Sequence, residues 1–213
     1  MAITIKKVDD LRKKLQKSFD ILVKKIGPIQ IGSPQLFPYG WRKAAKGRTV
    51  WRIVEEIITQ NLEKYHNEFN IDSVQSSESE VTVYDMKCEY EKMDAYVNIK
   101  SAVVGGKCQK DDISKADGLK SFYKEDADKQ FFVATFFIRF NKNMTIEITK
   151  AVVFPVAWIP DIYVNPSNNG NLQSAYYKNL DKAVQRTNRQ FITLLQEEIK
   201  NAAKKKQEKN KGS

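Results

Sequence analysis

Apolar residues recur every three or four positions in two segments near the N-terminus, and this period predicts two amphipathic helices. The first helix is expected over residues 7–26 and ends at Gly27-Pro28, a pair that breaks helices. The second is expected over residues 49–68 and has the clearer pattern. Its apolar stripe consists of Trp51, Val54, Ile58, Leu62 and Tyr65.

Two runs in the middle of the chain are strand-like, residues 81–90 and 95–102. The segment Glu91–Asp94 between them is expected to form the turn of a β-hairpin. Side chains alternate across a strand, so Asn98 and Lys100 leave the second run from the same face. On the first run the alternation groups Val81, Val83 and Asp85 on one face and Tyr84, Met86 and Cys88 on the other.

The second half of the chain predicts one helix, two more strands and a closing helix. A helix is expected over Ile113–Lys124, with Asp112 as its N-cap. Residues 131–140 are almost continuously apolar, which suits a strand buried on both faces, and residues 144–154 alternate. Strands 95–102 and 131–140, joined through a helix, could form a parallel crossover. The closing helix is expected over residues 177–203, after an irregular stretch at 155–177.

This order predicts an α/β (α+β) fold in which helices flank a mixed central β-sheet. The length of 213 residues suits a single domain, expected over residues 1–203, with a basic, disordered tail at 204–213. No apolar run reaches the length of a membrane span, and the N-terminus lacks the apolar core of a signal peptide. We therefore expect a cytoplasmic protein without a membrane partner.

Charge and cysteine usage narrow the function. The net charge of +10 suits a polyanionic partner, although a lysine-rich protein without such a partner is the alternative. Two cysteines, Cys88 and Cys108, and one histidine, His66, cannot assemble an ordinary zinc site within one chain. They also exclude nucleases that depend on paired histidines. If the protein is an enzyme, we expect carboxylates, lysine and a metal ion to do the chemistry.

The predicted hairpin supplies such a set of groups. Folding it brings the Asp85 carboxylate, the Asn98 amide oxygen and the Lys100 ammonium close together. Such a set can bind a divalent metal and activate a water against a phosphodiester. Asp94 is a rival metal ligand, but it is four residues before Asn98 and is expected in the turn.

Asp85 followed by Asn98-x-Lys100 resembles the motif of PD-(D/E)xK nucleases, above all type II restriction endonucleases. The resemblance covers a catalytic core at residues 48–155 and implies a restriction-endonuclease-like fold. It implies that Asp85, Asn98 and the Ile99 carbonyl hold Mg²⁺, and that Lys100 orients the attacking water. The sequence departs from the family at Tyr84, where proline is common, and at Asn98, where the family has Asp or Glu. A neutral amide oxygen at that position is expected to lower the affinity for metal.

Glu55 is a further candidate catalytic residue. At 100° per residue it flanks the apolar stripe of the second helix. In the PD-(D/E)xK fold the helix before the catalytic hairpin often supplies a glutamate to the site, so the resemblance implies that role for Glu55. An edge glutamate with its carboxylate in water is the alternative.

Three segments are candidates for contact with DNA. The alternatives are, in order, a surface loop pinned by aromatic packing, an ordinary strand-to-helix connection and an Asn-rich surface turn. The first segment combines aromatic and basic residues, the second combines glycines with lysines, and the third carries amides that can read base edges. The residues are Arg42, Lys43, Lys46 and Arg48; Gly105, Gly106, Lys107 and Lys110; and Asn168, Asn169, Asn171 and Gln173.

The sequence therefore predicts a magnesium-dependent type II restriction endonuclease that cleaves double-stranded DNA at a specific palindromic site. A two-fold site is matched by a two-fold protein, so a homodimer is expected. The alternatives are a non-catalytic basic DNA-binding protein with a decayed site, and a membrane-surface or scaffold protein that uses the lysine-rich tail.

Overall fold

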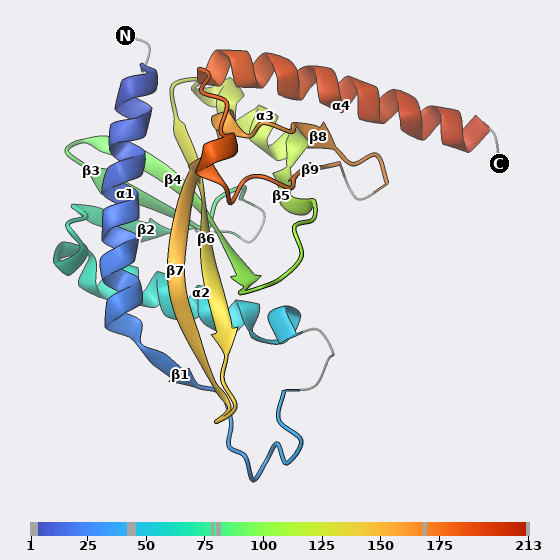
Figure 1. The fold of residues 1–213 in the computed structure, drawn as a ribbon. Coiled ribbons are helices and arrows are strands. Elements are labelled where there is room, and N and C mark those ends of the chain that lie inside the picture. Colours follow the sequence, from blue (N-terminus) through green and yellow to red (C-terminus); the bar gives the residue numbers. More distant parts are fainter. Residues whose placement is uncertain (1–3, 42–45, 78, 80–81, 168–169, 212–213) are drawn as a thin grey trace.

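A mixed six-stranded β-sheet forms the centre of the protein (Figure 1). The structure is a computed structural model that describes residues 4–41, 46–77, 79, 82–167 and 170–211. The strand order is β1-β7-β6-β4-β3-β2, in which β4 and β6 are parallel and the other neighbours are antiparallel. The strands are β1 (Pro28–Gln30), β2 (Ser73–Ser76), β3 (Met86–Tyr90), β4 (Met93–Val103), β6 (Gln130–Phe140) and β7 (Thr145–Pro155).

Helices cover both faces of this sheet. On one face α1 (Ile5–Ile26) packs against β7 and α2 (Lys46–Tyr65) packs against β4 and β2. On the other face α3 (Ala116–Glu125) and α4 (Asn188–Lys211) pack on each other. Alternation along β4 divides its side chains between these layers. The mixed sheet flanked by helices is the predicted fold class, and the β4–α3–β6 crossover confirms the predicted parallel pair.

The β3–β4 hairpin forms through a tighter turn than predicted. Glu91 and Lys92 have φ angles of 49° and 66°, the left-handed values of a two-residue hairpin turn that matches the strand twist. Asp94, predicted in the turn, instead lies in β4 opposite Glu89. Strand β3 begins at Met86, so the predicted strand pattern over residues 81–85 is wrong in the described part of that segment.

A second, three-stranded sheet was not predicted. It consists of β5 (Asp111–Lys115), β9 (Asn171–Ser174) and β8 (Tyr163–Val164), in the order β5-β9-β8. The predicted helix over 113–124 therefore begins three residues later, at Ala116, and Asp112 does not cap it. Part of the stretch at 155–177, predicted as irregular, is strand, because β9 finds its partner in β5 about sixty residues away.

The closing helix also differs from its prediction. Helix α4 starts at Asn188, while residues 177–187 hold only the short 3₁₀ helix Leu180–Lys182. Two other 3₁₀ helices are His66–Phe69 and Val156–Trp158. Helix α4 continues to Lys211, so the tail predicted to be disordered from residue 204 is helical through Lys211. Residues 204–211 are Lys, Gln and Glu apart from Asn210, and these three residue types are strong helix formers.

Candidate active site

The candidate site lies where β3 stops pairing with β4. The register between these strands runs from Tyr90↔Met93 to Met86↔Val97, so β4 continues beyond Val97 without β3 beside it. The chain bends at this point, and the Asp85 side chain takes the place of a strand. Its Oδ2 accepts a hydrogen bond from the backbone N–H of Ile99 at 2.5 Å, and its backbone N–H donates to the Val97 carbonyl at 2.9 Å.

The Asp85 carboxylate is half-buried, and its surroundings compete over its charge. Burial raises its pKa, whereas the Ile99 N–H and the positive charges of Lys100 and Arg52 lower it. The net pKa shift is upward. An acidic group whose pKa is raised by burial and which lies near a lysine in a crevice is typical of a functional site.

The backbone of Ile99 offers a further oxygen at the same place. Within a strand, the N–H and C=O of one residue point to the same side. The Ile99 N–H points to Asp85, so the Ile99 carbonyl lies on the same side of β4. The pairing of β4 with β6 occupies the opposite side.

Asn98 is buried, with only 8% of its surface exposed. Its Nδ2 donates to the Val83 carbonyl at 3.0 Å, which fixes the orientation of the amide. Its Oδ1 is buried and accepts no hydrogen bond from the described residues. A buried acceptor without a donor lowers the free energy of unfolding by about 1–3 kcal/mol, so a hydrogen-bond donor or a cation bound at this oxygen would stabilise the protein.

Lys100 lies two residues further along β4 and is half-buried. It lines a cavity of about 460 Å³ together with Glu55 and Ser101. The rest of the lining comes from Trp51, Val54, Ile99 and Asp112. The ammonium of Lys100 lowers the pKa of both Asp85 and Glu55, which places its charge within reach of both carboxylates.

Glu55 reaches the same place from helix α2. Its side chain is 18% exposed, and its Oε2 lies 3.9 Å from Nη1 of Arg52, too far for a hydrogen bond. Burial and the negative charge of Asp85 raise the pKa of Glu55 to about 7, against the opposing charges of Arg52 and Lys100. Glu55 therefore faces Asp85 and Lys100 and does not point into bulk water.

The two layers of the fold meet at this site. Asn98 and Lys100 alternate with Ile99 along β4, and Tyr96, on their face, contacts Phe122 of α3. Glu55 approaches from α2, on the opposite face. These groups meet because β3 pairs with β4 only as far as Val97, which leaves the edge of β4 beyond Val97 open between the two faces.

The oxygen donors fit a hard divalent cation such as Mg²⁺. The donors on offer are two carboxylates, the orphaned Asn98 Oδ1 and a backbone carbonyl, and such oxygens are the ligands that Mg²⁺ prefers. No three His, Cys, Asp or Glu side chains come together as a metal-binding group in the described part of the chain. The donor set therefore depends on the amide and the carbonyl as well as on Asp85 and Glu55.

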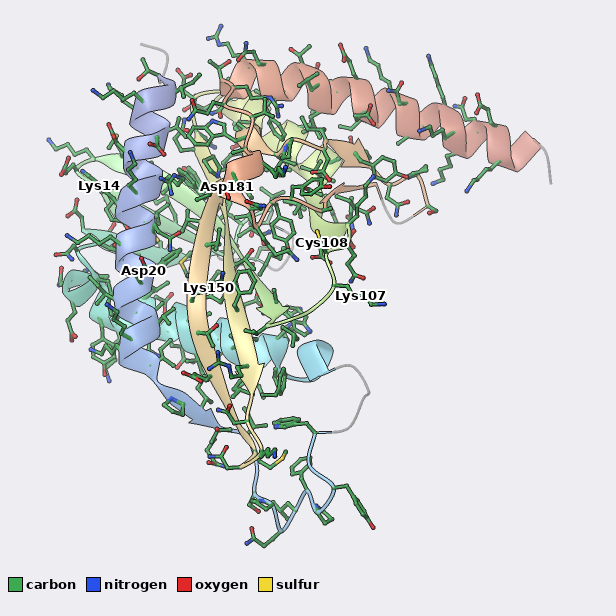
Figure 2. All side chains as sticks on the ribbon, in the orientation of Figure 1. Lys14, Asp20, Lys107, Cys108, Lys150 and Asp181 are labelled. Atoms are coloured by element: carbon green, nitrogen blue, oxygen red, sulfur yellow. The ribbon has the colours of Figure 1, made fainter. Side chains whose placement is uncertain are left out.

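A groove continues from the site along the connection between β4 and β5. It has a volume of about 730 Å³ and starts at Lys100 and Ser101. One wall includes Gly106 and Lys107, and the other runs over residues 175–179. Figure 2 shows the Lys107 side chain pointing away from the body on this connection. Gly105, with a φ of 76°, allows the turn that starts it.

The amides expected to read bases are differently engaged. Asn171 and Gln173 lie in β9, where their side-chain amides donate to the two carboxylate oxygens of Asp112 at 3.0 and 2.7 Å. These contacts support the small sheet and engage both amides as donors, and contact of Asn171 and Gln173 with DNA stays a prediction. Asn168 and Asn169 lie outside the described residues.

The remaining basic candidates are partly described. Arg42 and Lys43 lie outside the described residues. Helix α2 begins at Lys46, but the side chains of Lys46 and Arg48 are not among the described ones. Lys110 is exposed, and its Nζ lies 4.1 Å from the ring centroid of Tyr163. Asp94, the rival metal ligand, forms an ion pair with Lys87 at 3.6 Å.

Sequence reasoning missed two residues of this region, Arg52 and Asp112. Arg52 lowers the pKa of both site carboxylates, and Asp112 lines the cavity beside Lys100. The spacing of Arg52 three positions before Glu55 was a signal in the sequence. Nothing local marks Asp112, whose partners lie about sixty residues away.

Comparison with known proteins finds similarity to solved structures. No protein-family model matches the sequence, and no curated protein matches it. Among solved structures the chain is similar to Hjc, a Holliday junction resolvase from Archaeoglobus fulgidus, an archaeal hyperthermophile. The identity is 10% and the TM-score 0.37, over 66% of this chain and 92% of the resolvase.

Proposed function

We propose that this protein is a metal-dependent DNA endonuclease of the type II restriction class, which hydrolyses phosphodiester bonds at a specific site in double-stranded DNA. One observation carries the proposal: the carboxylates of Asp85 and Glu55 lie within electrostatic reach of each other and of Lys100, at the open edge of β4. Burial and a neighbouring like charge disfavour the ionised form of an acid, and a bound cation would offset this cost at Asp85 and Glu55.

Each side chain has a separate task in this proposal. Asp85, Asn98 and the Ile99 carbonyl would hold Mg²⁺, which supplies Lewis-acid polarisation of the phosphate and lowers the pKa of a bound water. Lys100 orients the attacking water and stabilises negative charge on the phosphorane. Glu55, with a pKa of about 7, is able to accept a proton at neutral pH and orders the water network.

The groove beside Lys100 is the proposed path of the DNA backbone. Lys107 lines it and is exposed, so it is able to contact phosphate without leaving an existing ion pair among the described contacts. Palindromic sites are cut by symmetric pairs of subunits, so a homodimer belongs to the proposal. The helices of the described residues include no membrane-spanning segment.

A non-catalytic DNA-binding protein is the second candidate function. Asn98 stands where an acid would strengthen the metal site, and the described residues lack a cluster of three acidic, cysteine or histidine ligands. In that case the net charge of +10 would serve binding alone.

The deciding experiment is incubation of the purified protein with phage or plasmid DNA, with Mg²⁺ or with EDTA, followed by gel electrophoresis. Discrete bands that require Mg²⁺ support the site-specific endonuclease, and mapping their ends gives the recognition site. A smear indicates a nuclease without sequence specificity. Binding without cleavage in Mg²⁺ and in Mn²⁺, on several DNA substrates, favours the non-catalytic protein.

A further inference from the structure

Helix α4 changes character along one face. Up to Ala202 that face is apolar and packs on the body, with Phe191, Leu195 and Ala202 buried. At 100° per residue, Lys205, Lys206 and Lys209 lie within about 60° of the direction of Ala202. The stripe that contacts the body therefore continues as a stripe of lysines. We call these three residues the inner lysines.

The inner lysines lie where α4 leaves the body. Figure 1 shows the C-terminal end of α4 projecting beyond the rest of the molecule. Each residue from 203 to 209 is exposed. The apolar part of this face packs on the body, and the basic part beyond it projects into solvent. The basic part is therefore suited to bind an anionic partner that lies alongside the body.

The base of this projecting segment is connected to the groove beside the candidate site. Nζ of Lys205 lies 6.0 Å from the ring centroid of Tyr163, and Nζ of Lys110 lies 4.1 Å from the same centroid. Lys110 belongs to the β4–β5 connection, whose Lys107 lines the groove that starts at Lys100. A series of lysines thus extends from the site to α4.

We propose that the inner lysines bind the phosphate backbone of duplex DNA that flanks the bond being cut. This proposal rests on the proposed function for the position of the cut, and it extends that function to a binding surface away from the chemistry. A membrane surface is the less suitable partner. Helices that lie on membranes carry large apolar residues opposite their lysines, whereas residues 203–211 include no apolar residue larger than alanine.

The helix supplies its own control for a test. Lys200 and Lys204 are exposed and lie about 160° from Ala202, on the outer face. The inner variant is Lys205→Gln/Lys206→Gln and the outer variant is Lys200→Gln/Lys204→Gln. Each variant loses two positive charges. Glutamine keeps a helix propensity close to that of lysine. Circular dichroism of both full-length variants checks that the helix is intact.

Binding to a fluorescent duplex is measured by anisotropy in EDTA over a series of salt concentrations. Each phosphate contact contributes a slope of about −0.9 to log K against log salt, so the inner variant should lose up to about 1.8 of the slope. Its affinity should fall by up to about 60-fold near 0.1 M salt, because the slope of about 1.8 acts over the decade of salt concentration below about 1 M. The outer variant should bind like the unmodified protein. Equal losses in both variants, or none in either, would overturn the proposal.

Two further measurements separate the possible failures. Vesicles that contain phosphatidylserine test the other anionic surface: a loss of vesicle binding in the inner variant, with DNA binding unchanged, would assign the lysines to membranes and overturn the proposal. Cleavage is measured separately with Mg²⁺. Absence of cleavage together with the expected difference between inner and outer variants would refute the nuclease and leave the DNA-binding role of α4 in place.

Discussion

The backbone N–H of Ile99 donates a 2.5 Å hydrogen bond to the carboxylate of Asp85. Strand β4, which carries Asn98 and Lys100, thereby holds the acid that directly precedes the neighbouring strand β3, and it does so through its main chain. The relative position of these three groups does not depend on long, flexible side-chain contacts. Such preorganisation is what a site needs to act on a phosphodiester.

Lys100→Ala should reduce cleavage by about 10³-fold while DNA binding changes little, because one ammonium is lost from a protein of net charge +10. Cleavage is measured on plasmid DNA with Mg²⁺ and binding by anisotropy in EDTA. Lys120→Ala, which removes an exposed lysine from α3, is the control. Undiminished cleavage by the Lys100 variant would show that the site is elsewhere.

Asp85→Ala should abolish cleavage and weaken metal binding, since it removes the charged oxygen beside the Ile99 carbonyl. Asp85→Asn is the matched variant, because its amide oxygen still accepts the Ile99 N–H while the charge is gone. We expect both variants to be inactive and only the alanine variant to lose the support of β4, as measured by thermal unfolding. If both Asp85 variants still cleave DNA and Asp94→Ala does not, the metal ligand is Asp94 and not Asp85.

Asn98→Asp should preserve or raise cleavage at limiting Mg²⁺, because a carboxylate binds the cation more tightly than an amide. The same change removes the donor to the Val83 carbonyl, so the free energy of unfolding without metal should fall by about 1–3 kcal/mol. Metal titration by calorimetry and urea unfolding separate the two effects. Weaker metal binding in a folded variant would show that the amide has a role that an acid does not fill.

Glu55 makes stability depend on pH. Its pKa is about 7 in the fold, above its ordinary value of 4.5, so the folded state retains a proton that the unfolded chain releases between these values. The stabilisation is complete below pH 4.5 and is lost as the pH rises through 7. Glu55→Gln cannot ionise, so at pH 8 without metal it should be more stable than the unmodified protein by about 3 kcal/mol, from the size of the shift.

Urea unfolding of both proteins at pH 4 and pH 8 measures this difference. Their stabilities should converge at pH 4, where the glutamate is neutral in both states. Parallel pH profiles would mean that Glu55 ionises normally and does not face Asp85. Under the proposed function, the glutamine variant should also lose the rise in cleavage rate between pH 6 and pH 8.

The sequence was informative wherever the relevant contacts were local. The near-continuous apolar run of β6 and the helical period of α2 indicated both elements, because burial of a strand or a helix face leaves its period in the chain. The same period placed Glu55 beside the apolar stripe, and the structure places it beside Asp85. The Gly27-Pro28 pair likewise gave the end of α1.

Where the contacts are distant, the sequence was misleading. Asp112 is a residue type that often caps helices at the N-terminus. Its carboxylate instead accepts hydrogen bonds from Asn171 and Gln173 across the small sheet. Strands as short and polar as β5 and β9 have no alternation of their own, since only pairing stabilises them. The charge of the lysine-rich tail predicts disorder. Its helix propensity and its continuity with α4 make it helical through Lys211.

The β4–β5 connection has one end in each of the two sheets, since β4 belongs to the large sheet and β5 to the small one. A ligand in the groove along this connection therefore touches both sheets, and its binding free energy includes their docking on each other. By thermodynamic linkage, a substitution that destabilises the small sheet, such as one at Asn171, lowers the affinity for that ligand without removing a contact to it. Affinity at the candidate active site is in this way a property of both sheets.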